Sequence, residues 1–156
     1  MNLVDVFKPD YIKIPLDKNN KNDVIRELVE ILNSNGAVSN PQQIMEAVFD
    51  REKIMTTGVG NGVAIPHCKH KESHNFAIAL GIHPSGIDFE SIDNKPAHII
   101  FLLVGPEDQP GTHIKLLSRI SRIISQDDVR EKVLECKTPE ELFDLIKEEE
   151  KHFAVS

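Results

Sequence analysis

The sequence predicts an α/β protein with a single mixed β-sheet and helices packed on both faces, a three-layer α/β/α sandwich. Residues 98–104 form a run that is apolar at every position after His98, which is typical of a central strand covered on both faces. Helical and strand-like patterns occur along the chain with no linker, internal repeat or low-complexity stretch between them. The 156 residues, 40% of them hydrophobic, suffice to bury one core. We therefore expect one domain over residues 1–147.

The first third of the chain predicts an edge strand and two helices. Residues 11–16 alternate in polarity, and Pro15 suits the edge of a sheet. Between Asn22 and Gly36 the apolar residues keep to one helical face, with these two residues as N-cap and C-terminal stop. A second helix is predicted to open at Asn40 and Pro41.

Short strands are predicted in the middle of the chain. Residues 63–65 form an apolar run that Pro66 ends, and residues 76–82 alternate large with small side chains. The polar stretch 68–75 is expected to be a loop, and residues 84–86 a turn before another short strand. Residues 98–104 then supply the middle of the sheet.

The last third predicts three helices. Thr112 is expected to cap the first, with His113 as its first residue and Ile114, Leu117, Ile120 and Ile124 as its buried stripe. Asp127 or Asp128 is expected to cap the next, and residues 138–141 form a capping box for the last. Residues 148–156 are expected to be a fraying polar tail.

Composition excludes several classes of protein. A net charge of −7 argues against general binding to nucleic acid or acidic lipid. No apolar run is long enough to span a membrane, and residues 1–5 lack the pattern of a secretory signal, so we expect a cytoplasmic protein without membrane insertion. The two cysteines are too few for a disulfide framework.

The stretch 56–67 combines three alternate glycines with a short strand that delivers His67. Gly58, Gly60 and Gly62 would let backbone N–H groups approach an anion. The spacing does not fit a dinucleotide fingerprint, because Val63 stands where the third glycine belongs, nor a nucleotide P-loop, because no Gly-Lys-Ser/Thr run occurs. A glycine-rich turn before an ordinary exposed histidine is the alternative reading.

A second histidine has an equally unusual position. His113 is predicted at the N-terminus of a helix, where unpaired N–H groups and the helix dipole attract anions, and where Thr112 could add a hydroxyl. If the strand that carries His67 lies beside the helix that carries His113, one imidazole could act as a nucleophile toward phosphorus. The other could then donate a hydrogen bond to the transferred oxygens.

With these residues the sequence resembles the enzyme IIA components of the bacterial phosphoenolpyruvate-dependent phosphotransferase system, in the fructose, mannitol and nitrogen-regulatory branch. The resemblance covers nearly the whole chain. It departs from the usual family pattern at Thr56, Asn94 and Ile114, and none of these changes affects His67. The segments that carry it are Arg51-Glu52, residues 57–67, residues 86–89 and residues 113–117.

The resemblance implies a function. His67 would accept a phosphoryl group, as tele-phosphohistidine, from the histidine-containing phosphocarrier protein and pass it to a cysteine of an enzyme IIB. His113 and Arg51 would stabilise that group, and Thr57, Gly58, Gly60, Gly62 and Thr112 would form a phosphoryl-binding loop. Transfer from one imidazole to another, or to a thiolate, starts from a bond already poised for transfer, so we expect no metal or other cofactor.

Two other functions stay open. Within the family, the chain could be a nitrogen-regulatory protein whose phosphorylation state controls partner proteins. Outside it, His67, His70 and His74 are close enough in sequence to suggest a zinc site. Adjacent lysines make this loop a poor cation site, which disfavours zinc.

Overall fold

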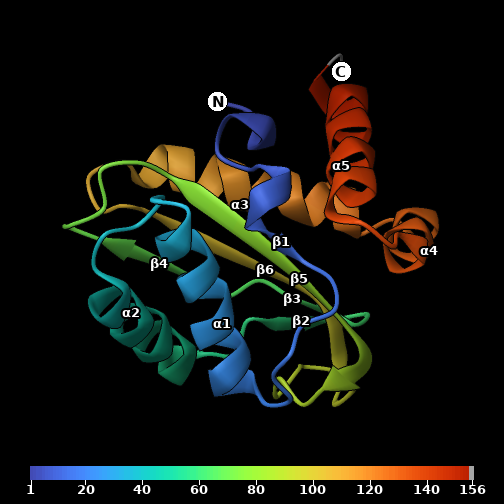
Figure 1. Cartoon of the computed structure of the whole chain (residues 1–156), viewed down its shortest axis with the longest axis horizontal. Coiled ribbons are helices and arrows are strands. Elements are labelled where there is room, and N and C mark those ends of the chain that lie inside the picture. The colour runs from blue at the N-terminus through green and yellow to red at the C-terminus, as the bar shows by residue number, and fades with distance from the viewer. Residues whose placement is uncertain (155–156) are drawn as a thin grey trace.

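The computed structural model describes residues 1–154 as a mixed sheet between two helical layers (Figure 1). The strands are β1 (Ile12–Lys13), β2 (Gly58–Gly60), β3 (Val63–Ala64), β4 (His67–His70), β5 (Ala77–Ile87) and β6 (Ala97–Pro106). The helices are α1 (Lys21–Ser34), α2 (Pro41–Ile54), α3 (Pro110–Ile124), α4 (Asp127–Glu135) and α5 (Pro139–Ala154). Two short 3₁₀ helices, Leu3–Asp5 and Pro9–Tyr11, open the chain.

Strand β6 lies in the middle of the sheet, as the apolar run predicted. The order is β1-β5-β6-β3-β2, and β4 pairs with β6 farther along the same side as β3. Strands β3 and β4 run parallel to β6, whereas β5 runs antiparallel to it. The prediction of a mixed sheet is therefore confirmed.

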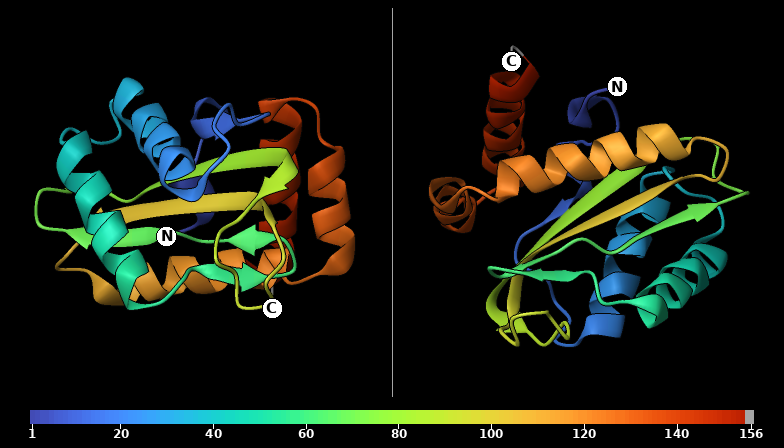
Figure 2. Two further views of the ribbon diagram at one scale, coloured as in Figure 1. Left: turned by 90° about the horizontal axis from the view of Figure 1, so that it is seen from below. Right: turned by 180° about the vertical axis from the view of Figure 1, so that it is seen from behind.

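The sheet is covered on both faces, so the prediction of three layers is also confirmed. Helices α1 and α2 pack on one face, and α3 crosses the other, with α4 and α5 beside it (Figure 2). Each face has its own core because side chains alternate along the strands. Along β6, for example, Phe101 and Leu103 face the α3 side, whereas Ile100, Leu102 and Val104 face α1 and α2.

Several boundaries differ from the sequence prediction. Strand β4 occupies the first half of the expected polar loop, because its residues pair with residues 103–106 of β6. Strand β5 does not end at the expected turn but continues to Ile87 through a shift in register after Ile82. Helix α3 begins at Pro110 with Gln109 as its N-cap, so Thr112 lies within the first turn and does not cap the helix.

The expected polar tail from residue 148 is also corrected. Helix α5 continues to Ala154, and Glu150 is 4% exposed. Its carboxylate accepts hydrogen bonds from the backbone N–H groups of Leu3 (2.6 Å) and Val4 (3.4 Å) and from Arg119 of α3 (3.3 Å). Glu150 thus binds the start of the chain to α3 and α5. Residues 155 and 156 lie outside the described residues.

None of the helices within residues 1–154 combines the length and the apolar character that crossing a membrane requires.

Candidate functional site

A cleft of about 460 Å³ opens at the edge of the sheet where β4 lies between α2 and α3. Asp50, Arg51 and Ile54 line it from the end of α2, His67 and Lys69 from β4, and His113 and Ile114 from the start of α3. The structure therefore brings together the three residues that the sequence analysis placed at the centre of the chemistry. A larger groove of about 610 Å³, between β1 and α1, contains none of them.

His67 is the first residue of β4, and its ring is fixed by the chain just before it. Its Nδ1 lies 2.7 Å from the carbonyl oxygen of Ile65. A carbonyl oxygen can only accept, so Nδ1 carries the proton and donates it. In the neutral ring, the lone pair is therefore on Nε2. The side chain is half-buried, and the ring lines the cleft.

His113 forms the inner wall of the cleft. Its ring centroid lies 5.6 Å from that of His67, with 55° between the planes, and Phe76 lies 6.1 Å away from it. The side chain is 2% exposed, and neither ring nitrogen has a hydrogen-bond partner among the described residues. A buried polar group without a partner costs about 1–3 kcal/mol. Unpaired buried groups are rare, and a catalytic role is one of the reasons for which they are retained.

The position of His113 depends on which face of α3 is buried. The buried residues are His113, Leu116, Ile120, Ile123 and Ile124. The predicted stripe began one residue later, but Ile114 is 65% exposed. Both stripes have helical spacing, so the pattern alone could not decide between them. Burial of the stripe that starts at His113 turns the imidazole inward, toward His67.

The surroundings of both imidazoles favour the neutral form, because they lower the pKa of each ring. Burial is the main cause that lowers the pKa of His67, and the positive charges of Arg51 and Lys69 lower it further, against the opposing effects of the Ile65 carbonyl and Glu52. Burial also lowers the pKa of His113, to about 4, with help from His67 and Lys69. A neutral His67 keeps its Nε2 lone pair available for reaction.

Arg51 reaches the cleft from the last turns of α2. Its guanidinium donates a hydrogen bond to the carbonyl oxygen of Met55, 3.0 Å away. The neighbouring Glu52 accepts from the backbone N–H of Thr57 (3.2 Å) and from the Thr57 hydroxyl, and pairs with Lys21 at 2.8 Å. Glu52 thus fixes the chain after α2, and with it the position of Arg51.

Lys69 was not predicted as a site residue, because the polar pattern of residues 68–75 indicated a loop. In the structure Lys69 lies two residues after His67 on β4 and lines the same cleft. The signal available in the sequence was the alternation of polar His67 and Lys69 with apolar Cys68, which continues the strand pattern beyond Pro66.

The expected phosphoryl-binding loop is not assembled around His67. Strand β3 pairs with Ile99 and Ile100, whereas His67 pairs with Leu103, so Gly60 and Gly62 lie farther down the sheet. None of the three glycines lines the cleft, and neither do Thr57 and Thr112.

The three glycines are needed for the conformation and close packing of the backbone. Gly60 and Gly62 have φ of +95° and +77° in the turn between β2 and β3, a region that residues with a Cβ rarely adopt. A Cβ on Gly58 would lie 2.8 Å from Cα of Ser91. Gly58 is therefore required for the close approach of the 88–96 segment.

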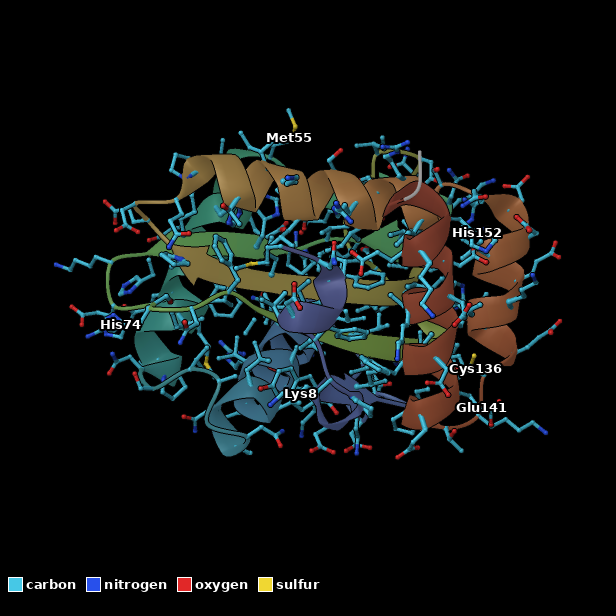
Figure 3. The ribbon with its side chains drawn as sticks, turned by 90° about the horizontal axis from the view of Figure 1, so that it is seen from above. Lys8, Met55, His74, Cys136, Glu141 and His152 are labelled. Carbon is cyan, nitrogen blue, oxygen red and sulfur yellow. The ribbon has the colours of Figure 1, made fainter. Side chains whose placement is uncertain are left out.

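The alternative zinc site is not assembled either. Within residues 1–154, no three His, Cys, Asp or Glu side chains are grouped so that they could hold a metal ion. His70 accepts a hydrogen bond from the backbone N–H of Glu72, and His74 projects from the outer end of the molecule (Figure 3).

Comparison with known proteins adds a family match. The family model described as "Phosphoenolpyruvate-dependent sugar phosphotransferase system, EIIA 2" matches residues 5–149. A fructose-specific EIIABC component of Bacillus subtilis is 34% identical over 97% of this chain, although the chain spans only 24% of that relative's length. A nitrogen regulatory protein of Bradyrhizobium diazoefficiens is 31% identical over 94% of this chain and 95% of its own.

A solved structure has the same fold. The nitrogen regulatory protein IIA-Ntr of Neisseria meningitidis superposes with a TM-score of 0.85 at 28% identity, covering 91% of this chain and 97% of that one. Sugar-specific and regulatory proteins are therefore both among the relatives.

Proposed function

The chain belongs to the EIIA 2 family of the phosphoenolpyruvate-dependent sugar phosphotransferase system, and we propose that it carries a phosphoryl group on Nε2 of His67. In this proposal the donor is the histidine-containing phosphocarrier protein, and the acceptor is a cysteine of an enzyme IIB. The observation that carries the proposal is the hydrogen bond from Nδ1 of His67 to the Ile65 carbonyl, which leaves Nε2 as the nucleophilic nitrogen.

The transfer step needs no proton movement at His67. The Nε2 lone pair forms the new P–N bond while the electron pair of the donor's P–N bond returns to the donor ring. The His67 ring gains positive charge, and its Nδ1–H already donates to the Ile65 carbonyl oxygen, 2.7 Å away, which stabilises that charge. When the phosphoryl group leaves, the ring returns to its neutral state, which makes it a good leaving group.

His113 and Arg51 act on the phosphoryl oxygens. Neutral His113 has one N–H to donate, and its ring faces that of His67 at 5.6 Å without another described partner. Arg51 adds a positive charge from the α2 side of the cleft. Donors fixed in advance around a transferring phosphoryl group stabilise the charge that develops on its oxygens.

The proposal is tested by reconstitution with phosphoenolpyruvate, enzyme I and the histidine-containing phosphocarrier protein. We expect one acid-labile, base-stable phosphoryl group per chain, and none on a His67→Ala variant. The control is His70→Ala, which removes a nearby histidine that does not line the cleft. Full labelling of the His67→Ala variant would contradict the proposal.

A second candidate function is regulation by the phosphorylation state, favoured by the match to a nitrogen regulatory protein along nearly the whole chain. Phosphorylation adds a charge of about −1.5 to −2 at the mouth of the cleft, enough to change which partner surface is accepted. The labelled chain distinguishes the two functions when it is mixed with a fructose-type enzyme IIB. A sugar carrier loses its label to the IIB cysteine, whereas a regulator retains it.

A further inference from the structure

We propose that Lys69 is a further catalytic residue of this cleft, whose ammonium group binds the oxygens of the phosphoryl group carried by His67. The inference rests on the proposed function and extends it to a residue of β4 that lies outside the segments carrying the family resemblance.

The strand places Lys69 beside the nucleophile. Strand β4 pairs in regular register with β6, His67 opposite Leu103 and Lys69 opposite Gly105. Alternate residues of a strand share a face and lie about 7 Å apart along it. Cys68, between them, is buried against the core under α1 and α2. Lys69 therefore projects from the same side of β4 as His67 and lines the same cleft.

Lys69 has no carboxylate partner within the part of the chain that the structure describes. Two other lysines near the cleft are paired with carboxylates, Lys21 with Glu52 and Lys53 with Asp50. None of the ion pairs or hydrogen bonds within residues 1–154 includes the Lys69 ammonium. The chain as a whole has a net charge of −7. An unpaired positive charge beside the nucleophile would therefore attract an anionic substrate to this cleft.

The field of Lys69 reaches both imidazoles. Its charge lowers the pKa of His67 and of His113, which line the cleft together. A phosphoryl group on Nε2 of His67 would lie close to the same ammonium group. The positive charge of Lys69 that disfavours a protonated imidazole would attract the negative charge of the phosphoryl oxygens.

The charge of the phosphoryl group indicates what Lys69 does in the cleft. A phosphoryl group carries about −1.5 to −2 charges. With His113 neutral, Arg51 supplies a single positive charge, and Lys69 supplies the second. The two cations lie on different elements, α2 and β4, so they can contact the phosphoryl group from two directions. Lys69 stays an ammonium group throughout: it donates hydrogen bonds and gives up no proton.

The test uses phosphoramidate, a small chemical donor that phosphorylates histidine directly, so that docking of a partner protein does not affect the rate. The variants are Lys69→Met, Lys69→Arg and the matched control Lys71→Met, which removes the same charge from a lysine outside the cleft. We expect labelling of Lys69→Met to be at least tenfold slower than wild type, Lys69→Arg to recover most of the rate, and Lys71→Met to match wild type.

A second readout separates catalysis from structure. In an NMR titration we expect the pKa of His67 to rise in Lys69→Met but not in Lys71→Met, with both variants folded by their amide spectra. Labelling of Lys69→Met within twofold of wild type, or an equal loss in Lys71→Met, would overturn the assignment. The proposed function is tested separately by His67→Ala, which phosphoramidate should leave unlabelled.

Discussion

The rings of His67 and His113 face each other at 5.6 Å although 45 residues separate them in sequence. His67 comes from the strand at the sheet edge, and His113 from the first turns of the helix that covers that edge. Neither ring donates to the other, and the space beside them opens into the cleft.

Replacement of His113 by Ala should slow phosphoryl transfer without abolishing labelling. The nucleophile and its bond to Ile65 remain, but the phosphoryl oxygens lose one fixed donor. Removal of a single such donor typically costs about 10²–10³ in rate. Single-turnover transfer to an enzyme IIB measures the effect. Unchanged transfer, or complete loss of labelling in a folded variant, would contradict these roles.

The low pKa of His113 predicts that the free energy of unfolding decreases as the pH is lowered. Its pKa is about 4 in the folded chain and about 6.5 in an unfolded one. Between these values the unfolded state binds more protons, so the folded state loses stability as the pH falls from about 6.5 to 4. The loss is on the order of 3 kcal/mol at most.

Urea denaturation of the wild type and of a His113→Gln variant at pH 7, 5.5 and 4.5 measures this effect. The variant lacks the titrating group, so its stability should fall less than that of the wild type as the pH is lowered. Parallel curves for the two proteins would show that His113 does not titrate as described.

Glu150 gives a prediction about stability away from the cleft. Replacement of Glu150 by Ala leaves the N–H groups of Leu3 and Val4, and the Arg119 guanidinium, without their buried partner. Arg119 is partly exposed and also donates to Asn2, so the main cost is that of leaving buried N–H donors without an acceptor, about 1–3 kcal/mol. The control is Glu148→Ala, because Glu148 is exposed and its one ion pair within residues 1–154 is with exposed Lys151. Equal denaturation midpoints for the two variants would contradict a structural role for Glu150.

The pattern of apolar residues was sufficient to predict the layers and the middle strand. The apolar run indicated a strand covered on both faces, and in the structure residues 99–104 contribute alternately to the two cores. The site was predicted less completely. A helix with apolar residues on two overlapping stripes does not show whether His113 or Ile114 turns inward, and only packing against the sheet decides this.

Long-range pairing decided the remaining differences. The strand character of residues 67–70 depends on pairing with β6, more than thirty residues later, so a local polar pattern suggested a loop. The pattern around Glu150 indicated a solvated acidic run, because its three partners, Leu3, Val4 and Arg119, are distant in sequence. The glycines at 58, 60 and 62 suggested an anion-binding loop. In the structure Gly60 and Gly62 have the positive φ of the hairpin turn, and Gly58 lies in close contact with Ser91.

Gly105 connects the packing of the core to the position of His113 in the cleft. This residue pairs with Lys69, and a Cβ placed on it would overlap the ring of Phe76, which packs on His113 at 6.1 Å. Phe76 is 5% exposed and has little room to move, so Gly105→Ala should cost about 1–3 kcal/mol. Displacement of Phe76 should also move the His113 ring and slow phosphoryl transfer.

Gly111 provides the matched control, because a Cβ there meets nothing within 4 Å and the residue lies in the first turn of α3. Gly111→Ala should leave stability unchanged or raise it by up to about 1 kcal/mol. Thermal denaturation and single-turnover transfer are measured on both variants. If Gly105→Ala is destabilised but transfers at the wild-type rate, Phe76 packs the core without positioning His113.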